Sequence, residues 1–116
     1  MAITCTYQTA TISTSEYSLP ANTTVSVPTA QTSTGIIQVY ADVANMVAGD
    51  QYELKLYEKC NTASTQRLVD TWILTGAQAR PMFVGPALIL SQGWDFTAKR
   101  LAGSDRVIGW SVRTVA

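Results

Sequence analysis

The sequence predicts an all-β protein: an antiparallel β-sandwich, immunoglobulin-like or jelly-roll, with an extended N-terminal arm. From residue 35 on, the sequence has seven or eight short predicted strands, most of which alternate between apolar and polar residues as half-buried strands do. No stretch of ten residues has helical periodicity, and turn residues separate the segments, as in sandwiches. The length of 116 residues suits one domain. A small closed barrel is the alternative architecture.

Residues 1–34 differ in composition from the rest of the chain. They contain fifteen Ser and Thr residues and a single charged residue. Ile3, Cys5 and Tyr7 alternate with threonines, which predicts one strand. Because the segment has too few apolar residues to fold alone, two interpretations remain: a poorly ordered leader with an edge strand, or an arm that docks on a neighbouring subunit. The predicted sandwich domain is residues 35–116.

The other predicted strands are residues 23–27, 37–43, 52–56, 66–75, 82–84, 87–90, 94–99 and 107–113. Most of these predictions rest on alternation or on β-branched composition. The alternation fails near Leu68 and Val69, which predicts a β-bulge there. Pro86 cannot donate a hydrogen bond to a sheet, so it is expected at a strand start or on an edge.

The last two alternating segments predict a β-hairpin around the turn at 102–105. The apolar residues of both strands must share one face, which restricts the register. We prefer the register that places Asp95 opposite Arg113 and small Ala98 opposite large Trp110. Opposite charges across a strand pair are favourable by roughly 0.2–1 kcal/mol, whereas the other register opposes two arginines.

Composition excludes several classes of function. Eight basic and eight acidic residues give a formal net charge of zero, whereas nucleic-acid binding normally needs a basic excess. The chain has no histidine, which removes Ser-His-Asp and Cys-His catalysis and metal binding through imidazole. Glycine-rich phosphate loops are absent from the sequence. We therefore expect no catalytic residue, no metal and no cofactor.

Three further features have an ordinary structural interpretation. Asp42, Asp50 and Glu53 surround one predicted turn and match no calcium-loop spacing, so we expect them to be solvated. Without a visible secretory signal, we expect Cys5 and Cys60 to be reduced. The longest apolar run is far shorter than the roughly 20 residues that span a bilayer, so we expect no membrane contact.

Exposed aromatic and apolar residues are the candidates for binding. Tyr40 and Tyr57 fall on the polar faces of their strands, where a tyrosine can stack on a sugar ring or anchor a protein interface. In the predicted arm, the residues expected to contact a partner are Tyr7, Ile12, Tyr17 and Leu19. The three tryptophans lie on apolar strand faces and are expected in the core.

The C-terminal segment resembles small proteins encoded among the structural genes of tailed bacteriophages. The residues that carry the likeness are Gly93-Trp94-Asp95-Phe96-Thr97, Lys99, Gly103, Asp105-Arg106, Ile108, Trp110-Ser111 and Arg113, with Ala48-Gly49-Asp50 and Pro86, Leu88 and Leu90 before them. The resemblance covers residues 36–116. It implies a virion component with an all-β fold and no enzymatic site. Head decoration proteins of such phages are small β-sandwiches or jelly rolls, commonly trimeric, that clamp neighbouring capsid subunits.

These observations lead to one functional hypothesis and one alternative. We expect a non-enzymatic capsid decoration (cement) protein, made in the host cytoplasm and located in the virion. Its partners would be the major capsid protein, or another virion protein, and other copies of itself, with a trimer as the working oligomer. The arm would add a strand to a neighbour's sheet, so deleting residues 1–34 should leave a folded domain that no longer binds particles. The alternative is a tail, connector or fibre module that recognises a glycan or a protein.

Overall fold

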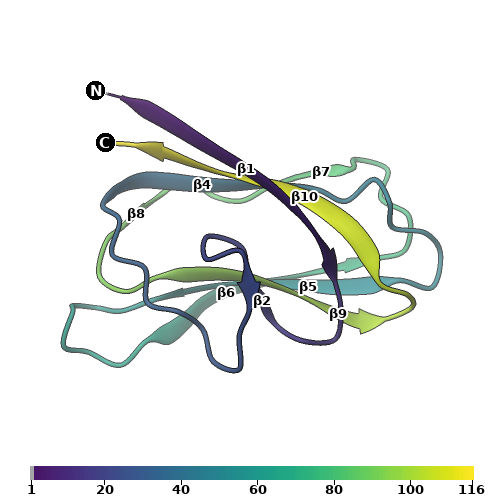
Figure 1. The fold of residues 1–116 in the computed structure, drawn as a ribbon, viewed down its shortest axis with the longest axis horizontal. Coiled ribbons are helices and arrows are strands. Elements are labelled where there is room, and N and C mark those ends of the chain that lie inside the picture. Colours follow the sequence, from purple (N-terminus) through teal and green to yellow (C-terminus); the bar gives the residue numbers. More distant parts are fainter. Residues whose placement is uncertain (1) are drawn as a thin grey trace.

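The computed structural model describes residues 2–116 and consists of two antiparallel sheets that form two layers (Figure 1). Within these residues every element is a strand, which confirms the all-β prediction. The strands are β1 (Ile3–Ile12), β2 (Tyr17–Ser18), β3 (Thr23–Thr24), β4 (Gly35–Asp42), β5 (Gln51–Glu58), β6 (Arg67–Thr75), β7 (Met82–Val84), β8 (Leu88–Leu90), β9 (Asp95–Ala102) and β10 (Arg106–Val115).

The strands pair in a nested order. Sheet 1 has the order β1-β10-β4-β7, and β8 also pairs with β4; sheet 2 has the order β3-β2-β9-β5-β6. The first strand therefore pairs with the last, β2 pairs with β9, β4 pairs with β7 and β8, and β5 pairs with β6. Along the chain, β1 and β2, β4 and β5, and β9 and β10 each divide between the two sheets.

The alternation of apolar and polar residues predicted most of the strands correctly, and also one irregularity within them. The pairing of β5 with β6 places Leu56 opposite Asp70 and Tyr57 opposite Leu68, so Val69 has no partner. This confirms the bulge that the broken alternation at Leu68 and Val69 predicts. The segment predicted at 23–27 is shorter than expected, because only β3 pairs there.

The predicted C-terminal hairpin is wrong. β9 lies between β2 and β5 in sheet 2, whereas β10 lies between β1 and β4 in sheet 1. Asp95 is opposite Tyr57, and Arg113 is flanked by Cys5 and Gln38. Two adjacent strands with matching apolar faces can lie side by side in one sheet or face each other across a core, and alternation alone does not distinguish these cases. Here they face each other.

Asp50 holds the connection between β9 and β10 where it crosses from one sheet to the other. The Asp50 carboxylate, only 2% exposed, accepts hydrogen bonds from the Ser104 backbone N–H at 3.1 Å and from Arg106 Nε at 2.8 Å. A Cβ on Gly103, whose φ is +85°, would lie 2.2 Å from Asp50 Oδ1. The Tyr52 hydroxyl donates to the Ser104 carbonyl at 2.8 Å. The expectation that Asp50 is a solvated turn residue is therefore wrong.

Residues 2–34 do not form an arm that stands apart from the sandwich. β1 pairs with β10 along its whole length, and β2 pairs with β9. Ile12 and Leu19 are 0% and 1% exposed, in the centre of the core. Backbone pairing requires no apolar side chains, and threonine is a good strand former, so a composition that suggested a weakly folding segment is compatible with an integral strand. The truncation lacking residues 1–34 should therefore fail to fold.

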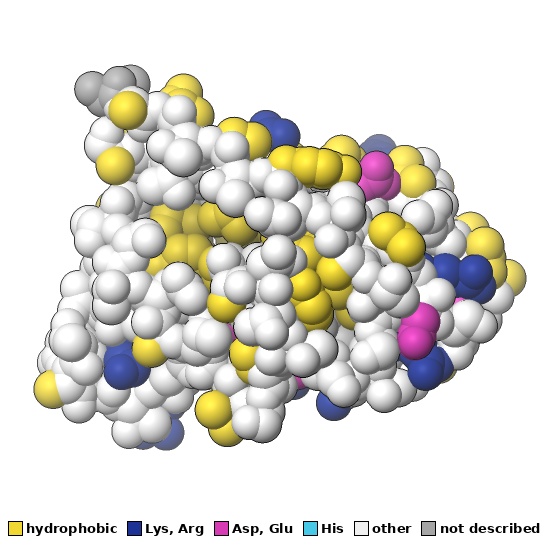
Figure 2. All heavy atoms as spheres, viewed as in Figure 1, with side chains coloured by type: hydrophobic (Ala, Val, Ile, Leu, Met, Phe, Trp, Pro, Cys, Tyr) yellow, Lys and Arg dark blue, Asp and Glu magenta, His cyan; other side chains and the backbone are white. Residues whose placement is uncertain are grey.

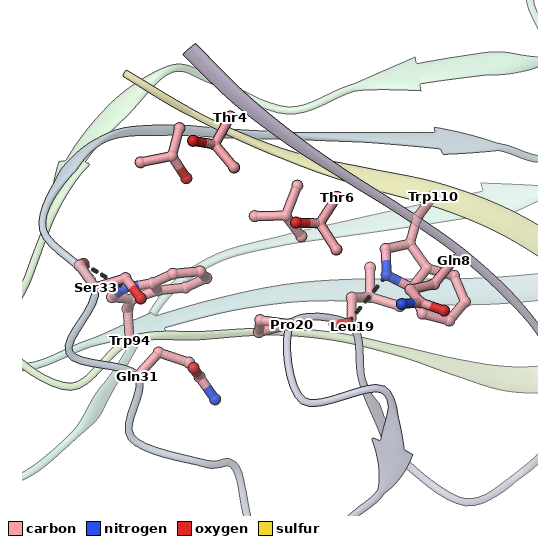
Figure 3. A pocket seen from close by; sticks show the side chains of 11 residues that line it. Thr4, Thr6, Gln8, Leu19, Pro20, Gln31, Ser33, Trp94 and Trp110 are labelled. Carbon is pink, nitrogen blue, oxygen red and sulfur yellow. Dashed lines mark hydrogen bonds between the residues drawn. The ribbon is translucent and has the colours of Figure 1, made fainter. Parts of the chain in front are cut away.

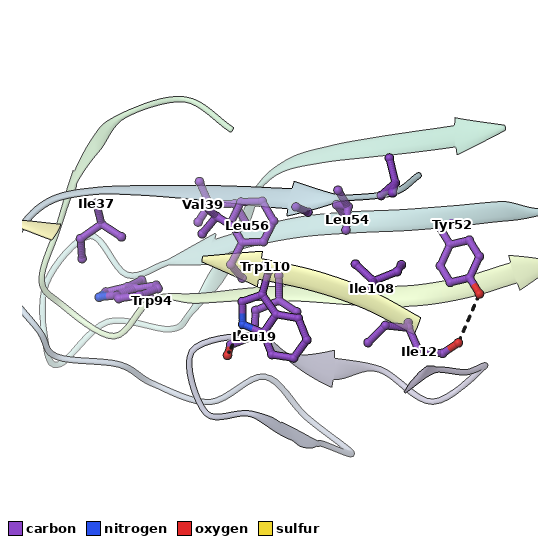
Figure 4. Close-up of a cluster of buried hydrophobic side chains, with 14 of the residues drawn as sticks. Ile12, Leu19, Ile37, Val39, Tyr52, Leu54, Leu56, Trp94, Ile108 and Trp110 are labelled. Atoms are coloured by element: carbon purple, nitrogen blue, oxygen red, sulfur yellow. Dashed lines mark hydrogen bonds between the residues drawn. The ribbon is translucent and has the colours of Figure 1, made fainter. Parts of the chain in front are cut away.

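The core lies between the two sheets, and aromatic side chains in it donate hydrogen bonds to backbone carbonyls (Figure 4). Trp110 Nε1 donates to the Leu19 carbonyl at 3.0 Å, and the Ile12 carbonyl, 3.3 Å from the Tyr52 hydroxyl, shares the proton that this hydroxyl donates to Ser104. The buried apolar residues are Ile12, Leu19, Ile37, Val39, Ala41, Val43, Met46, Tyr52, Leu54, Leu56, Leu90, Trp94, Phe96, Ala98, Ile108 and Trp110. Trp94 and Trp110 are in the core as expected, whereas Trp72 is only half-buried and stacks on Phe96.

Ile12→Ala should lower the free energy of unfolding by about 2–5 kcal/mol, because it leaves a cavity in the core. The matched control is Ile3→Ala in the same strand. Ile3 is 73% exposed, and this change should stay within about 0.5 kcal/mol. Urea denaturation of both variants measures the difference. Equal losses would contradict the assignment of the N-terminal segment to the core.

Stability should also fall on acidification through Asp50. The Arg106 guanidinium and the backbone N–H groups of Val47 and Ser104 hold the pKa of Asp50 at about 2, below its usual 3.8. A lowered pKa in the folded state stabilises the fold above about pH 4, and this contribution is lost as the pH falls towards 2. Denaturation of Asp50→Asn should therefore have a shallower pH dependence in this range than the original protein. Identical slopes would contradict the assignment.

Candidate functional site

A groove opens on the side of the molecule where β1 forms the edge of sheet 1 (Figure 2). Its volume is about 340 Å³. Eleven residues line it: Thr4, Thr6, Gln8, Leu19, Pro20, Gln31, Ser33, Trp94, Trp110, Val112 and Thr114. Figure 2 shows it as a hollow with a hydrophobic floor, surrounded by mostly uncharged atoms.

The groove exists because sheet 2 does not extend beneath the first half of β1. Even-numbered residues of β1 point to the inner side, as buried Ile12 shows, but Thr4 and Thr6 are exposed there. The facing strands β2 and β3 have two residues each, and the turn between them contains Asn22 at φ 55°. Short strands below a ten-residue strand leave an inner surface without a covering layer.

Two tryptophans, Trp94 and Trp110, lie at the floor of the groove, where only a small part of each is exposed (Figure 3). Trp94 Nε1 donates to the Ser33 carbonyl at 3.1 Å, and Trp110 Nε1 donates to the Leu19 carbonyl at 3.0 Å. Both indole N–H groups are therefore occupied. The walls carry threonine hydroxyls and glutamine amides, and Gln8 Oε1 accepts from Asn22 Nδ2 at 3.3 Å. With no ionisable side chain in its lining, the groove offers hydrogen bonds and apolar contact to a neutral ligand.

The outer face of sheet 1 brings together two of the predicted binding residues. Tyr7 and Tyr40 lie on either side of Ser111 in adjacent strands, and both line a second depression of about 210 Å³. Tyr7 is 68% exposed. The Arg113 guanidinium lies 3.6 Å from the centre of the Tyr40 ring, a cation–π contact that holds this ring on the sheet.

Around these tyrosines lies an apolar surface, the sheet 1 patch. It consists of Ile3, Tyr7, Ile36, Tyr40, Met82, Val84, Ile89 and Val107. The register places Ile36 beside Ile89 and Tyr40 beside Val84. Sequence reasoning missed the aliphatic members. These residues could have been found from runs of consecutive apolar residues in short strands such as 82–84 and 88–90, because in such a run both strand faces are apolar.

The other predicted binding residues are less accessible. The assignment of Ile12 and Leu19 to partner contacts is wrong, because both side chains lie in the protein's own core. Tyr17 packs edge-on against Trp110 at 5.5 Å, and its hydroxyl donates to Asn22 at 2.6 Å. Tyr57 lies on sheet 2, away from Tyr7 and Tyr40.

A buried polar cluster on β9 holds the segment 16–29, which includes β2 and β3, at this edge of sheet 2. Asp95, 0% exposed, accepts hydrogen bonds from the Ser18 hydroxyl and the Thr29 backbone N–H, both at 2.7 Å. Burial raises the pKa of Asp95 above its usual value, partly offset by these hydrogen bonds. Glu16 accepts from the hydroxyls of Tyr57 and Thr97 at 2.9 and 2.5 Å. These carboxylates hold the chain in place and line neither of the two depressions described above.

Residues 2–116 contain no group of three His, Cys, Asp or Glu side chains that could hold a metal ion. Both cysteines, Cys5 and Cys60, are exposed and unpaired. In the same range no helix is long and apolar enough to cross a membrane. Residues of β1 line both of the depressions described above.

Comparison with protein-family models, with curated proteins and with solved structures found no match to this chain.

Proposed function

We propose that this chain is a non-enzymatic virion protein with a jelly-roll fold that binds neighbouring capsid subunits. The nested strand order supports the fold type: a jelly roll is an antiparallel ribbon rolled up so that its outer strands pair first with last, second with second-last, and so on across two sheets. An immunoglobulin-like sandwich divides its strands differently. Viral capsid domains are among the frequent users of the jelly roll.

The sheet 1 patch carries the proposal for how this protein binds. Exposed apolar surface rimmed by polar residues is typical of protein interaction sites. Ile36 and Ile89 are neighbours at 45% and 80% exposure, and beyond Gln38 on the same face lie Val84 and Met82, at 48% and 50%, beside Tyr40 and Asp42. Tyrosines such as Tyr7 and Tyr40 frequently supply much of the energy in protein interfaces. On a symmetric shell, many such contacts add to one another.

Ile89→Asp should reduce binding to capsids by at least about tenfold, because it places a charge in the patch. The matched control is Ile73→Asp on the outer face of sheet 2, where Ile73 is 54% exposed. Co-sedimentation with particles that lack this protein measures binding, and thermal melts verify folding. If both variants bind as the original protein does, or if the original protein does not bind, the proposal is wrong.

A second candidate is a fibre or tail module that binds a neutral glycan, and the groove beneath β1 favours it. Its hydroxyls and amides above a floor of Trp94 and Trp110 are suitable for a sugar. Thr6→Leu removes a wall hydroxyl at an exposed position and should abolish any specific signal on a glycan array, whereas Ile89→Asp should retain it. An array without a signal from the original protein would exclude this candidate.

A further inference from the structure

The outer edge of β1 has unpaired backbone groups along its length. Ala2 and Ala116 exchange both backbone hydrogen bonds, each at 3.1 Å. In antiparallel pairs, residues alternate between hydrogen-bonded and non-hydrogen-bonded positions, so the even-numbered residues of β1 bond to β10. The odd-numbered residues then direct their N–H and C=O groups away from the sheet. They are Ile3, Cys5, Tyr7, Thr9 and Thr11.

This edge lacks the features that normally prevent strands from pairing with other chains. Proteins protect edges with charges, prolines, bulges or very short strands. β1 has ten residues, no charge and no proline, and its register with β10 is continuous. The other edges in residues 2–116 are protected: β3 has two residues, β7 and β8 have three each, and β6 carries Arg67 and Asp70 beside its bulge.

We propose that β1 pairs antiparallel with β1 of a second copy of this chain, around a two-fold axis at Tyr7. This register places Tyr7 opposite Tyr7 of the partner and Cys5 opposite Thr9, with Ile3 opposite Thr11. Every odd-numbered residue then sits at a hydrogen-bonded position. The two copies of sheet 1 become one continuous sheet, and the sheet 1 patches of both copies lie on the same side of it.

Symmetry favours a second copy over an unrelated segment. A two-fold pair occupies both unprotected edges in one closed contact, and the combined sheet then ends at the short strands β7 and β8 on each side. Charge agrees with this choice. Residues 1–34 contain one ionisable carboxylate side chain, Glu16, which is held by Tyr57 and Thr97 within its own protomer. Two copies can therefore meet along β1 without repulsion between like charges.

This inference goes beyond the proposed function and does not depend on it, because the test uses the purified chain alone. Sedimentation equilibrium over a concentration series, under reducing conditions that exclude a disulfide through Cys5 or Cys60, should show a monomer–dimer equilibrium. Amide hydrogen exchange by NMR should show protection of the odd-numbered β1 amides that grows with the dimer fraction. In the monomer only the even-numbered amides should be protected.

Two variants at one position test the contact itself. Thr9→Pro removes an outward N–H while leaving the bonds to β10, and Thr9→Lys places a charge on the edge. Each should weaken dimerisation by at least about tenfold, with thermal melts confirming that both fold. The control, Thr75→Lys at an exposed position of β6, should dimerise normally. A monomer at all concentrations, or a dimer in which the odd-numbered β1 amides exchange rapidly or which survives both Thr9 variants, would overturn the proposal.

Discussion

The pairing of β1 with β10 is the contact on which the rest of the sandwich depends. It joins residues 3–12 to residues 106–115, so every other strand of the nested order lies between its two members in the sequence. The same pairing positions Ile12 over the core, aligns the inner side of β1 with Trp110, and leaves the other edge of β1 open. Core, groove and free edge are three consequences of one strand pair.

Hydrogen bonds to buried carboxylates hold connecting segments that strand pairing does not. Asp50 ties the β9–β10 connection to the turn before β5, and Asp95 ties residues 18 and 29 to sheet 2. Burial by itself raises the pKa of both carboxylates, but their net pKa shifts have opposite signs. Arg106 keeps the pKa of Asp50 low, whereas Asp95 faces neutral donors and burial raises its pKa. A cationic partner stabilises the ionised form of a buried carboxylate, whereas neutral hydrogen-bond donors stabilise it less.

Strand positions could be predicted from the sequence, but strand partners could not. Alternation identified most strands and the bulge at Val69, because each depends on the local choice between inner and outer face. The predicted hairpin at residues 94–113 was wrong because two strands with a common apolar face can pair in one sheet or face each other from two sheets. Of the candidate contact residues, Tyr7 and Tyr40 lie together on sheet 1, whereas Ile12 and Leu19 fill the core. Composition alone could not distinguish an apolar residue that meets a partner from one that meets its own chain.

The backbone bonds between Ala2 and Ala116 place the two described ends of the chain side by side, at one corner of sheet 1 (Figure 1). A peptide or reporter domain fused to either end would emerge from the same corner. Fusions at both ends would crowd one another and the neighbouring edge of β1, while the opposite end of the molecule would remain clear. For display on a particle, this geometry favours a single fusion joined through a flexible spacer.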